Sequence, residues 1–258
     1  MNKTLLSKVG RYEFMAEPFH CDFSSRLFMG HLGNHLLNAA DFHSNDRGYG
    51  MSYLMPRHKT WVLSRLAIEM TDIPRSYDKF FVETWVENAM KYFTARDFKI
   101  VGKDEQVHGY AKSVWAMIDT DTRQPVDIFS INDGLIKEYI DEEKECPIAA
   151  SSRVKMSSKA AFVRSIDTYY SDVDVNGHIN SVKYIEHILD LFDIDYFKTH
   201  RLQRLEIAYV AESHQGDKLN FYQEEVGEDE YCIKITKVCK NNPEEMEVVR
   251  SKAKFVKN

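Results

Sequence analysis

The sequence predicts an α+β protein built from two similar halves, each with one helix and one antiparallel sheet. Two pairs of segments support the repeat, since "SRLAIEM" and "DKFFVETW" in the first half correspond to "QRLEIAY" and "DKLNFYQ" in the second. The Arg-Leu pairs, at Arg65 and Arg204, and the Asp-Lys pairs, at Asp78 and Asp217, are both 139 residues apart. The two halves therefore match in register, and a chance dipeptide does not explain the agreement.

Strand-like segments follow each Asp-Lys pair. They are "YFTARDFKIV" and "GYAKSVWAMID" in the first half, and "EYCIKITKVC" and "MEVVRSKAKFV" in the second. Their alternating apolar residues are typical of strands. Each half thus contains one short strand, one long helix and about four strands with tight links. Such a helix must be buried on one face of the sheet. A helix wrapped by a curved antiparallel sheet is the hotdog fold, so we expect a tandem (double) hotdog.

The helix of the second half is predicted from residues 171–192, "SDVDVNGHINSVKYIEHILDLF". Asn180 is a favourable N-cap for a helix that begins near Ser181. The helix of the first half is expected within "SSRLFMGHLGNHLLNAADF", with Ser24 or Ser25 as its N-cap. The predicted buried face of the second helix has apolar residues at every third or fourth position: Ile179, Val182, Ile185, Ile188, Leu189 and Phe192.

A linker is expected between the halves. Residues 140–159, "IDEEKECPIAASSRVKMSSK", are first charged and then rich in serine, without apolar periodicity. Such a composition is typical of an inter-domain connection. The predicted domains are an N-terminal hotdog at residues 1–139 and a C-terminal hotdog at residues 160–258.

Composition excludes several classes of function. The 258 residues are 43% hydrophobic and 12% aromatic, which is typical of a globular protein. A net charge of −6 argues against nucleic acid as the main partner. No apolar run is long enough for a signal sequence or a membrane span. The cysteines, which show no CxxC or metal-ligand spacing, indicate reduced thiols in a cytoplasmic protein: Cys21, Cys146, Cys232 and Cys239.

No cofactor or metal is expected. The sequence has no glycine-rich phosphate loop and no dinucleotide-binding fingerprint. His31 and His35 are four residues apart on the predicted first helix, but no third ligand has a suitable spacing, so helix packing is the preferred interpretation.

Polar residues alternate with small or apolar ones just before the second helix. They are Asp172, Asp174, Asn176, His178 and Asn180. The first half has "DFSSRLFMG" at this place, without an acid-amide-histidine series. This difference suggests that one half reacts while the other binds or braces. A solvated turn is the alternative, because Asn-Gly is a strong turn dipeptide.

Over residues 8 to 255 the chain resembles the acyl-acyl-carrier-protein (acyl-ACP) thioesterases, a double-hotdog family of plant plastid enzymes and bacterial relatives. In the first half the resemblance is carried by "GYG", "TWVLSRLAIE", "VETW", "ARDF" and "SVWAMIDTDTR". In the second half it is carried by Asp174, Asn176 and His178, followed by "INSVKYI". It implies hydrolysis of fatty acyl-ACP, release of free fatty acid and the end of chain elongation. The first domain would then lie on the side of the acyl-chain pocket.

The family's Glu-Cys pair falls on Glu212 and Ser213 of this chain. Ser213 stands where the family has cysteine, and serine is a much poorer nucleophile than cysteine unless a base activates it. This departure from the family's pattern favours a mechanism centred on the carboxylate. Glu212 is then a general base or a nucleophile, and a Ser213 nucleophile stays open. His178 would contact the thioester carbonyl or the departing sulfur, Asn176 would orient water or the carboxylate, and Asp174 would hold them or be a pure turn residue. The oxyanion is expected at the amino end of the second helix, where N–H groups are unpaired.

The resemblance also implies an acidic partner, an acyl-carrier protein, which an acidic enzyme must meet through a local basic patch. The first candidate is "RVKMSSKAAFVR", with Arg153, Lys155, Lys159 and Arg164, and the second is Arg57 to Lys59 with Arg65. An ordinary solvated face is the alternative for both. A homodimer is compatible with the sequence. Hydrolysis of acyl-CoA, dehydration chemistry, and a non-catalytic module that binds acyl chains or carrier protein remain alternative functions.

Overall fold

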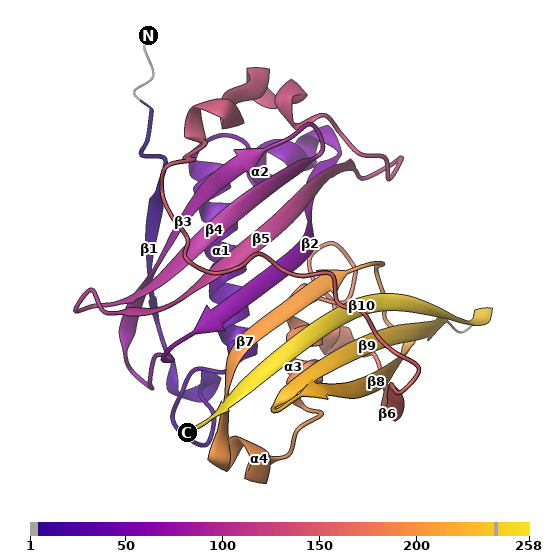
Figure 1. Cartoon of the computed structure of the whole chain (residues 1–258). Coiled ribbons are helices and arrows are strands. Elements are labelled where there is room, and N and C mark those ends of the chain that lie inside the picture. The colour runs from indigo at the N-terminus through magenta and orange to yellow at the C-terminus, as the bar shows by residue number, and fades with distance from the viewer. Residues whose placement is uncertain (1–4, 240–241) are drawn as a thin grey trace. The chain divides into compact units, whose positions relative to one another are not determined.

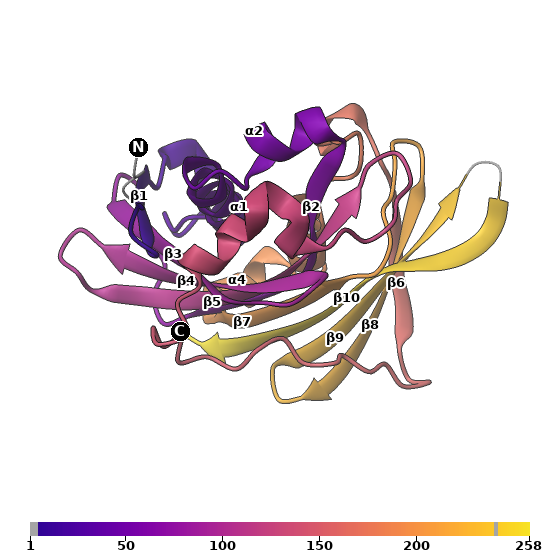
Figure 2. The same cartoon turned by 90° about the horizontal axis from the view of Figure 1, so that it is seen from above.

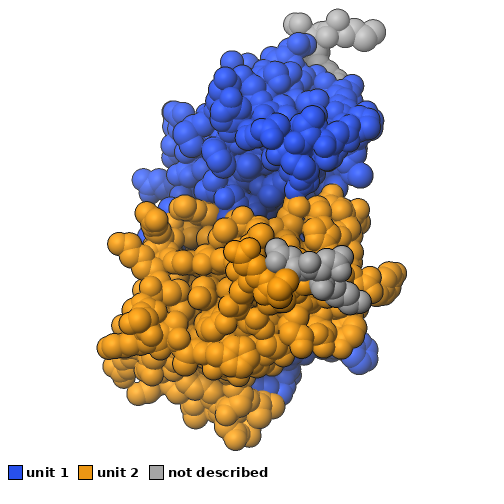
Figure 3. Space-filling view, turned by 90° about the vertical axis from the view of Figure 1, so that its right-hand side faces the viewer, with its two compact units in different colours: residues 1–64, 71–150 blue, residues 65–70, 151–258 orange. Residues whose placement is uncertain are grey.

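A computed structural model of the protein describes residues 5–239 and 242–258. The chain separates into two compact units, which Figure 3 shows in different colours. The first unit comprises Met1–Ser64 and Thr71–Ala150, and the second comprises Arg65–Met70 and Ser151–Asn258.

The first unit is a twisted antiparallel sheet with a long helix against one face (Figures 1 and 2). Its strands follow the order β1-β3-β4-β5-β2. The elements are β1 (Gly10–Met15), α1 (Met29–Asp46), α2 (Met51–Leu54), β2 (Lys59–Met70), β3 (Lys79–Ala89), β4 (Phe93–Gly102) and β5 (Val107–Asp119). Short 3-10 segments lie at Pro18–His20, Met55–Arg57 and Ile128–Tyr139.

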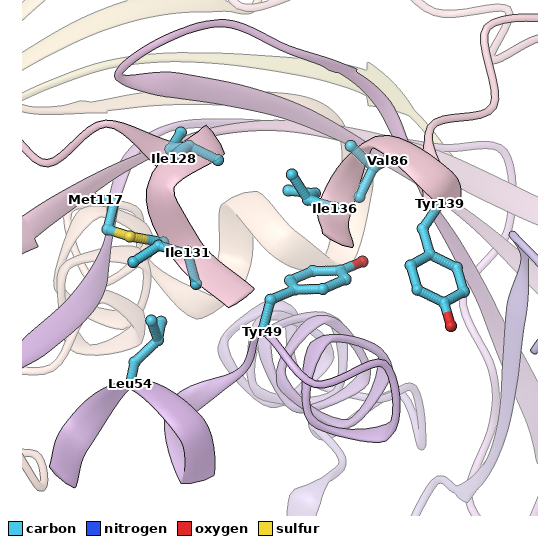
Figure 4. Packing of buried hydrophobic residues seen from close by; sticks show 8 residues of the cluster. All are labelled: Tyr49, Leu54, Val86, Met117, Ile128, Ile131, Ile136 and Tyr139. Atoms are coloured by element: carbon cyan, nitrogen blue, oxygen red, sulfur yellow. The ribbon is translucent and has the colours of Figure 1, made fainter. Parts of the chain in front are cut away.

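Helix α1 buries one face, as the apolar spacing predicts. Leu32, Leu36, Ala39 and Ala40 are almost inaccessible to solvent. A second apolar cluster joins α2, β3 and β5 to the 3-10 segment (Figure 4). Its buried members are Tyr49, Leu54, Val86, Met117, Ile128, Ile131, Ile136 and Tyr139.

The predicted N-cap of the first helix is wrong. Helix α1 begins at Met29, and its N-cap is Phe28, whose side chain makes no capping hydrogen bond. Ser24 instead donates both its N–H and its hydroxyl to Asp22 Oδ1, at 2.8 and 2.7 Å. Ser25 adopts a left-handed backbone conformation with φ of 60°. Both serines therefore belong to a turn organised by Asp22, ahead of the helix.

The second unit has the same kinds of element. Its strands follow the order β7-β10-β9-β8-β6, and residues 65–70 of β2 pair with β7. The elements are β6 (Ala161–Asp167), a 3-10 turn (Tyr170–Asp172), α3 (Ser181–Leu189), α4 (Ile194–Thr199), β7 (His200–Tyr209), β8 (Lys218–Gly227), β9 (Glu230–Cys239) and β10 (Asn242–Lys257). The two repeated segments thus pair with each other, since Leu66 lies opposite Ile207 and Ile68 opposite Leu205.

The helix of the second half is shorter than the apolar pattern indicates. Helix α3 has 9 residues, against 18 in α1. Asp193 accepts a hydrogen bond from the N–H of Tyr196 at 2.7 Å and so caps a separate helix, α4. Phe192 therefore lies beyond the end of α3, where its ring packs against Phe255 and Tyr231 at centroid distances of 4.6 and 4.9 Å.

Candidate functional site

The polar run before α3 forms a tight turn organised by Asp174. Its Oδ1 accepts the N–H of Asn176 at 2.8 Å and that of His178 at 3.4 Å. The N–H of Asp174 also donates to the carbonyl of His178 at 2.8 Å. Gly177 takes the left-handed conformation that the turn requires, with φ of 82°. The carboxylate of Asp174 thus holds the backbone of the two polar residues and leaves their side chains to other contacts.

Helix α3 begins where the sequence predicts. Asn180 is its N-cap, and its Oδ1 accepts the N–H of Val182 at 3.0 Å. The N–H of Asn180 donates to the carbonyl of Asp172, and the N–H of Ile179 donates to the carbonyl of Ser213, both at 2.8 Å. The second of these bonds ties the start of the helix to the loop that follows β7.

Fewer N–H groups are available at the helix start than we expected for an oxyanion site. The N–H groups of residues 177, 178, 179, 180, 182 and 183 all donate to acceptors within this turn, the helix or the neighbouring loop. The positive end of the helix dipole remains close to this position. Side chains must therefore supply more of the polar contacts to a substrate than the sequence suggested.

The structure brings His178 and Glu212 together. His178 Nε2 lies 3.3 Å from Glu212 Oε2, and their side chains are 23% and 33% exposed. Glu212 lies in the loop after β7, and the ring of His214 meets that of His178 edge to face at a centroid distance of 5.0 Å. Asn176 is exposed on the same turn. An imidazole and a carboxylate in contact, both reachable by solvent, form a pair that can exchange protons with a bound substrate.

Ser213 occupies a different environment from its neighbour Glu212. It is 0% exposed, and neither its hydroxyl nor that of the buried Tyr184 on α3 makes a hydrogen bond to the described residues. Burial raises the pKa of the Tyr184 phenol to about 12. A hydroxyl this enclosed, without a base bound to it, is poorly placed to act as a nucleophile.

The turn at Asp174 has a counterpart in the first unit. Asp22 Oδ1 accepts the N–H of Ser24 at 2.8 Å and that of Arg26 at 3.2 Å, and its own N–H donates to the carbonyl of Arg26 at 2.8 Å. Ser25, with its positive φ, takes the role of the glycine. These bonds match those around Asp174 one for one. The aspartate therefore belongs to a scaffold that both units share.

The side chains that the scaffold presents are different. In the first unit Leu27 donates its N–H to the carbonyl of Pro74 at 2.9 Å, which repeats the bond between the helix start and the loop. Ile73 precedes Pro74 and occupies the place of Glu212, while Arg26 occupies that of the histidine. The first unit thus has the same backbone framework without the histidine–carboxylate pair.

A surface depression of about 460 Å³ opens beside the Asp174 turn. Its lining residues are Tyr170, Ser171, Val173, Asp174, Val175 and Gln215. Tyr170 and Val175 are among the most exposed apolar side chains of the described residues. The depression leaves this side of the turn open to solvent.

The first basic candidate lies on a segment bound to the second unit. The N–H of Ser152 donates to Glu206 at 2.6 Å, Arg250 donates to the carbonyl of Val154 at 3.2 Å, and Ser157 is bound to Glu224. Arg153 and Lys155 lie on either side of the buried Val154.

Three of the four basic residues of this candidate, Arg153, Lys155 and Lys159, are exposed. Arg164 is engaged inside the unit, since it lies 3.5 Å from Asp190 and over the ring of Phe221. In the second candidate, the guanidinium of Arg57 stacks on Tyr53 at 3.8 Å, and Lys59 and Arg65 lie on β2.

The described residues contain no group of three or more His, Cys, Asp or Glu side chains that could hold a metal ion. His31 stacks on His20 at 4.0 Å, and His35 packs against Phe14 at 4.6 Å. None of the described helices has the length and apolarity needed to cross a membrane.

Comparison with known proteins places the chain in a family. The acyl-ACP thioesterase N-terminal domain matches residues 8–139, and the C-terminal domain matches residues 155–255. An acyl-ACP thioesterase from Bacteroides thetaiotaomicron has 50% sequence identity and a TM-score of 0.88, covering 96% of this chain and 98% of that one. The 12:0-ACP thioesterase of Umbellularia californica, at 19% identity, has a TM-score of 0.82 over 99% of this chain and all of the other. These similarities confirm the predicted tandem hotdog.

Sequence relatives agree. The chloroplastic oleoyl-acyl carrier protein thioesterase of Coriandrum sativum is 28% identical over 193 residues, which is 69% of this chain and 51% of that protein. The chain spans about half the length of the curated relatives it matches. Both domain models together cover most of the sequence, and the chain belongs to the acyl-ACP thioesterase family.

Proposed function

We propose that the chain hydrolyses the thioester of fatty acyl-acyl-carrier protein, releases free fatty acid and so ends chain elongation. The observation that carries the proposal is the contact between His178 Nε2 and Glu212 Oε2, at 3.3 Å, in a chain of this family. The relatives are named for oleoyl-ACP and 12:0-ACP, which are substrates of the same chemical class.

The reaction needs an activated water, a stabilised oxyanion and a route for the thiolate to leave. Glu212 takes a proton from water as the water oxygen attacks the carbonyl carbon, or it attacks that carbon itself to form an anhydride that water then opens. His178 donates a hydrogen bond to the developing oxyanion or to the departing sulfur. The carbon–sulfur bond breaks, and the thiolate is protonated. The neighbouring Glu212 and His178 can pass the proton between them.

The remaining residues of the cluster have supporting roles in the proposal. Asn176 is exposed on the turn, where its amide can orient the water or the acyl carbonyl. Asp174 fixes the turn through the N–H groups of Asn176 and His178. The burial of Ser213 supports a mechanism that does not use its hydroxyl.

A parallel assay tests this proposal. Release of free thiol is measured from acyl-carrier protein and from CoA that bear the same acyl group. The proposal expects faster turnover of the carrier-protein substrate. Preference for acyl-CoA would make the chain an acyl-CoA thioesterase, and binding without turnover would make it an acyl or carrier-protein binding module.

The variant Glu212→Gln tests the catalytic assignment. It keeps the size of the side chain but removes the proton acceptor, so kcat should fall by about 10²–10⁴-fold while the protein stays folded. Glu186→Gln is the control, because Glu186 is 30% exposed and also ion-paired, 2.7 Å from Lys183 on α3. Wild-type turnover by Glu212→Gln would contradict the assignment.

We also propose that Arg153, Lys155 and Lys159 help to dock the acidic carrier protein, with Arg164 in a structural role. The net charge of −6 makes long-range encounter repulsive, so a local patch of opposite sign is needed. The anchoring of the segment at Ser152 supports the proposal, because it holds the basic side chains in place.

Location and assembly are further expectations. All four cysteines are free thiols, which supports a cytoplasmic location. The relatives from plants are chloroplastic. The homodimer stays a prediction, which size-exclusion chromatography with light scattering can test.

A further inference from the structure

A buried lysine lies behind the proposed catalytic carboxylate. Lys237 on β9 is 8% exposed, and lysine is rarely buried without a partner. Its Nζ donates to the main-chain carbonyl of Glu212 at 2.6 Å and lies 3.6 Å from Asp217 Oδ2. Asp217 is also buried, so both charges of this pair are removed from most of the solvent.

The loop that carries Glu212 is held on both sides of the glutamate, since the N–H groups of Val210 and Ala211 donate to the carbonyl of Val248 at 2.8 and 3.4 Å and the carbonyl of Ser213 accepts the N–H of Ile179 at 2.8 Å. Residues 210–217 form no helix or strand. Asp217 Oδ2 accepts the N–H of His214 at 2.9 Å, and Thr168 Oγ1 accepts the N–H of Gly216 at 2.9 Å. These bonds hold the far end of the loop. Lys237 adds a side-chain hydrogen bond to the main-chain carbonyl of the glutamate itself.

The first unit shows that the loop does not need a lysine to fold. There Asp78 Oδ2 accepts the N–H of Arg75 at 2.8 Å, the same turn that closes the loop in the second unit. By strand register Gly102, opposite Phe80, corresponds to Lys237, opposite Leu219.

A Cβ at that glycine would require the ends of two side chains to move. A Cβ on Gly102 would lie 2.7 Å from Asp104 Oδ1 and 2.9 Å from His108 Nε2. The lysine therefore occurs only in the unit that also has the histidine–glutamate pair.

We propose that Lys237 is a positioning residue, which fixes the main chain of Glu212 so that its carboxylate meets His178. The proposal rests on the thioesterase function proposed above. A carboxylate released from this hold loses its alignment with the imidazole, and a misplacement of about 1 Å can cost about 10²-fold in rate. The competing interpretation is that Lys237 only neutralises the charge of Asp217. In that case the loss of Lys237 would change stability and leave kcat unchanged.

The test separates alignment from charge balance. In Lys237→Met combined with Asp217→Asn, both charges are removed, while the amide oxygen can still accept the N–H of His214. The double variant should unfold close to the wild-type temperature, lose about 10²-fold in kcat and keep its KM within about threefold. Lys252→Met is the matched control, because it breaks a 2.9 Å ion pair with Glu230 in the same unit.

A second variant covers the case in which the first does not fold. Lys237→Gln, also combined with Asp217→Asn, keeps an N–H donor toward the carbonyl of Glu212 and should recover most of the lost kcat. A crystal structure of either variant gives an independent readout. The Lys237→Met form should show a separation between His178 and Glu212 longer than 3.3 Å.

The proposal is overturned by a folded Lys237→Met form with wild-type kcat, or by an unchanged separation of His178 and Glu212. Kinetics use whichever thioester the wild type hydrolyses. If the wild type hydrolyses none, the proposed function fails, while the separation still decides the role of Lys237.

Discussion

The shared turn at Asp174 and Asp22 allows a scaffold role to be separated from a chemical one. In both turns one carboxylate oxygen accepts two N–H groups, at 2.8 and 3.4 Å in the second unit and at 2.8 and 3.2 Å in the first. Asparagine keeps an oxygen acceptor at this position but removes the charge. We predict that Asp174→Asn retains kcat within about tenfold, since turns of this kind form with asparagine as well as with aspartate.

The expected cost in stability follows from the hydrogen bonds. A bond to a charged acceptor contributes about 1.5–3 kcal/mol and a bond to a neutral one about 0.5–1.5 kcal/mol, so the loss of charge from an oxygen that accepts two N–H groups should lower the free energy of unfolding by about 2–3 kcal/mol. For a chain of this length each kcal/mol corresponds to a fall in Tm of about 2–4 °C. Asp174→Asn should therefore have a Tm no lower than that of Asp22→Asn, because Asp22 Oδ1 also accepts the Ser24 hydroxyl at 2.7 Å.

Turnover and thermal unfolding of these two variants are measured side by side. Asp22→Asn is the internal control, because it changes the same turn in the unit that lacks the histidine–glutamate pair. If Asp174→Asn lost more than about 10²-fold in kcat while matching the Tm of Asp22→Asn, its charge would take part in the chemistry. The scaffold interpretation would then be refuted.

Three further predictions address the nucleophile, the partner and acid stability. Ser213→Ala should keep substantial kcat, and an acyl-Ser213 adduct found by mass spectrometry would contradict this. Lys155→Glu with Lys159→Glu should lower kcat/KM for acyl-carrier protein alone, and the wild-type value should fall as salt rises. Burial lowers the pKa of His43 to about 2, so only the unfolded state binds a proton there and stability is lost as pH falls below about 6.5. His43→Gln should remove about 2 kcal/mol of this loss between about pH 7 and pH 5, measured by urea denaturation.

Sequence patterns predicted those features of the fold that depend on neighbouring residues in the chain. Asn180 caps α3 because its own side chain reaches the N–H of Val182, so the start of the helix can be read from one residue and its neighbours. The 139-residue repeat predicted equivalent strands, and the repeated segments proved to be β2 with β7 and β3 with β8. Neither inference required knowledge of distant contacts.

Predictions failed where a neighbouring side chain competed for the same groups. Ser24 and Ser25 were expected to cap α1, but Asp22 binds Ser24 and places both serines in a turn. The apolar pattern of α3 continues to Phe192, but Asp193 begins a new helix. Apolar periodicity cannot predict such competition, because it depends on the spacing of apolar residues and contains no information about hydrogen bonds.

The contacts of the candidate site depend on tertiary structure. His178 and Glu212 lie on different elements, and the resemblance to a family, not the local pattern, suggested that they act together. Lys237 was missed because "CIKITKVC" has the polar alternation of an exposed strand face. The buried pair with Asp217 appears only when β9 is placed beside the loop.

The histidine, glutamate and lysine of the candidate site occur together in the second unit, and the proposed chemistry requires all three positions. The turn and the loop bond of the scaffold recur in the first unit, where Arg26, Ile73 and Gly102 stand in place of the histidine, glutamate and lysine. A histidine alone at Arg26 would have no carboxylate to meet, and a glutamate alone at Ile73 would have no lysine to hold its main chain. Each single change gives little advantage by itself. The same framework can therefore persist in both units while the proposed reactive set occurs in one.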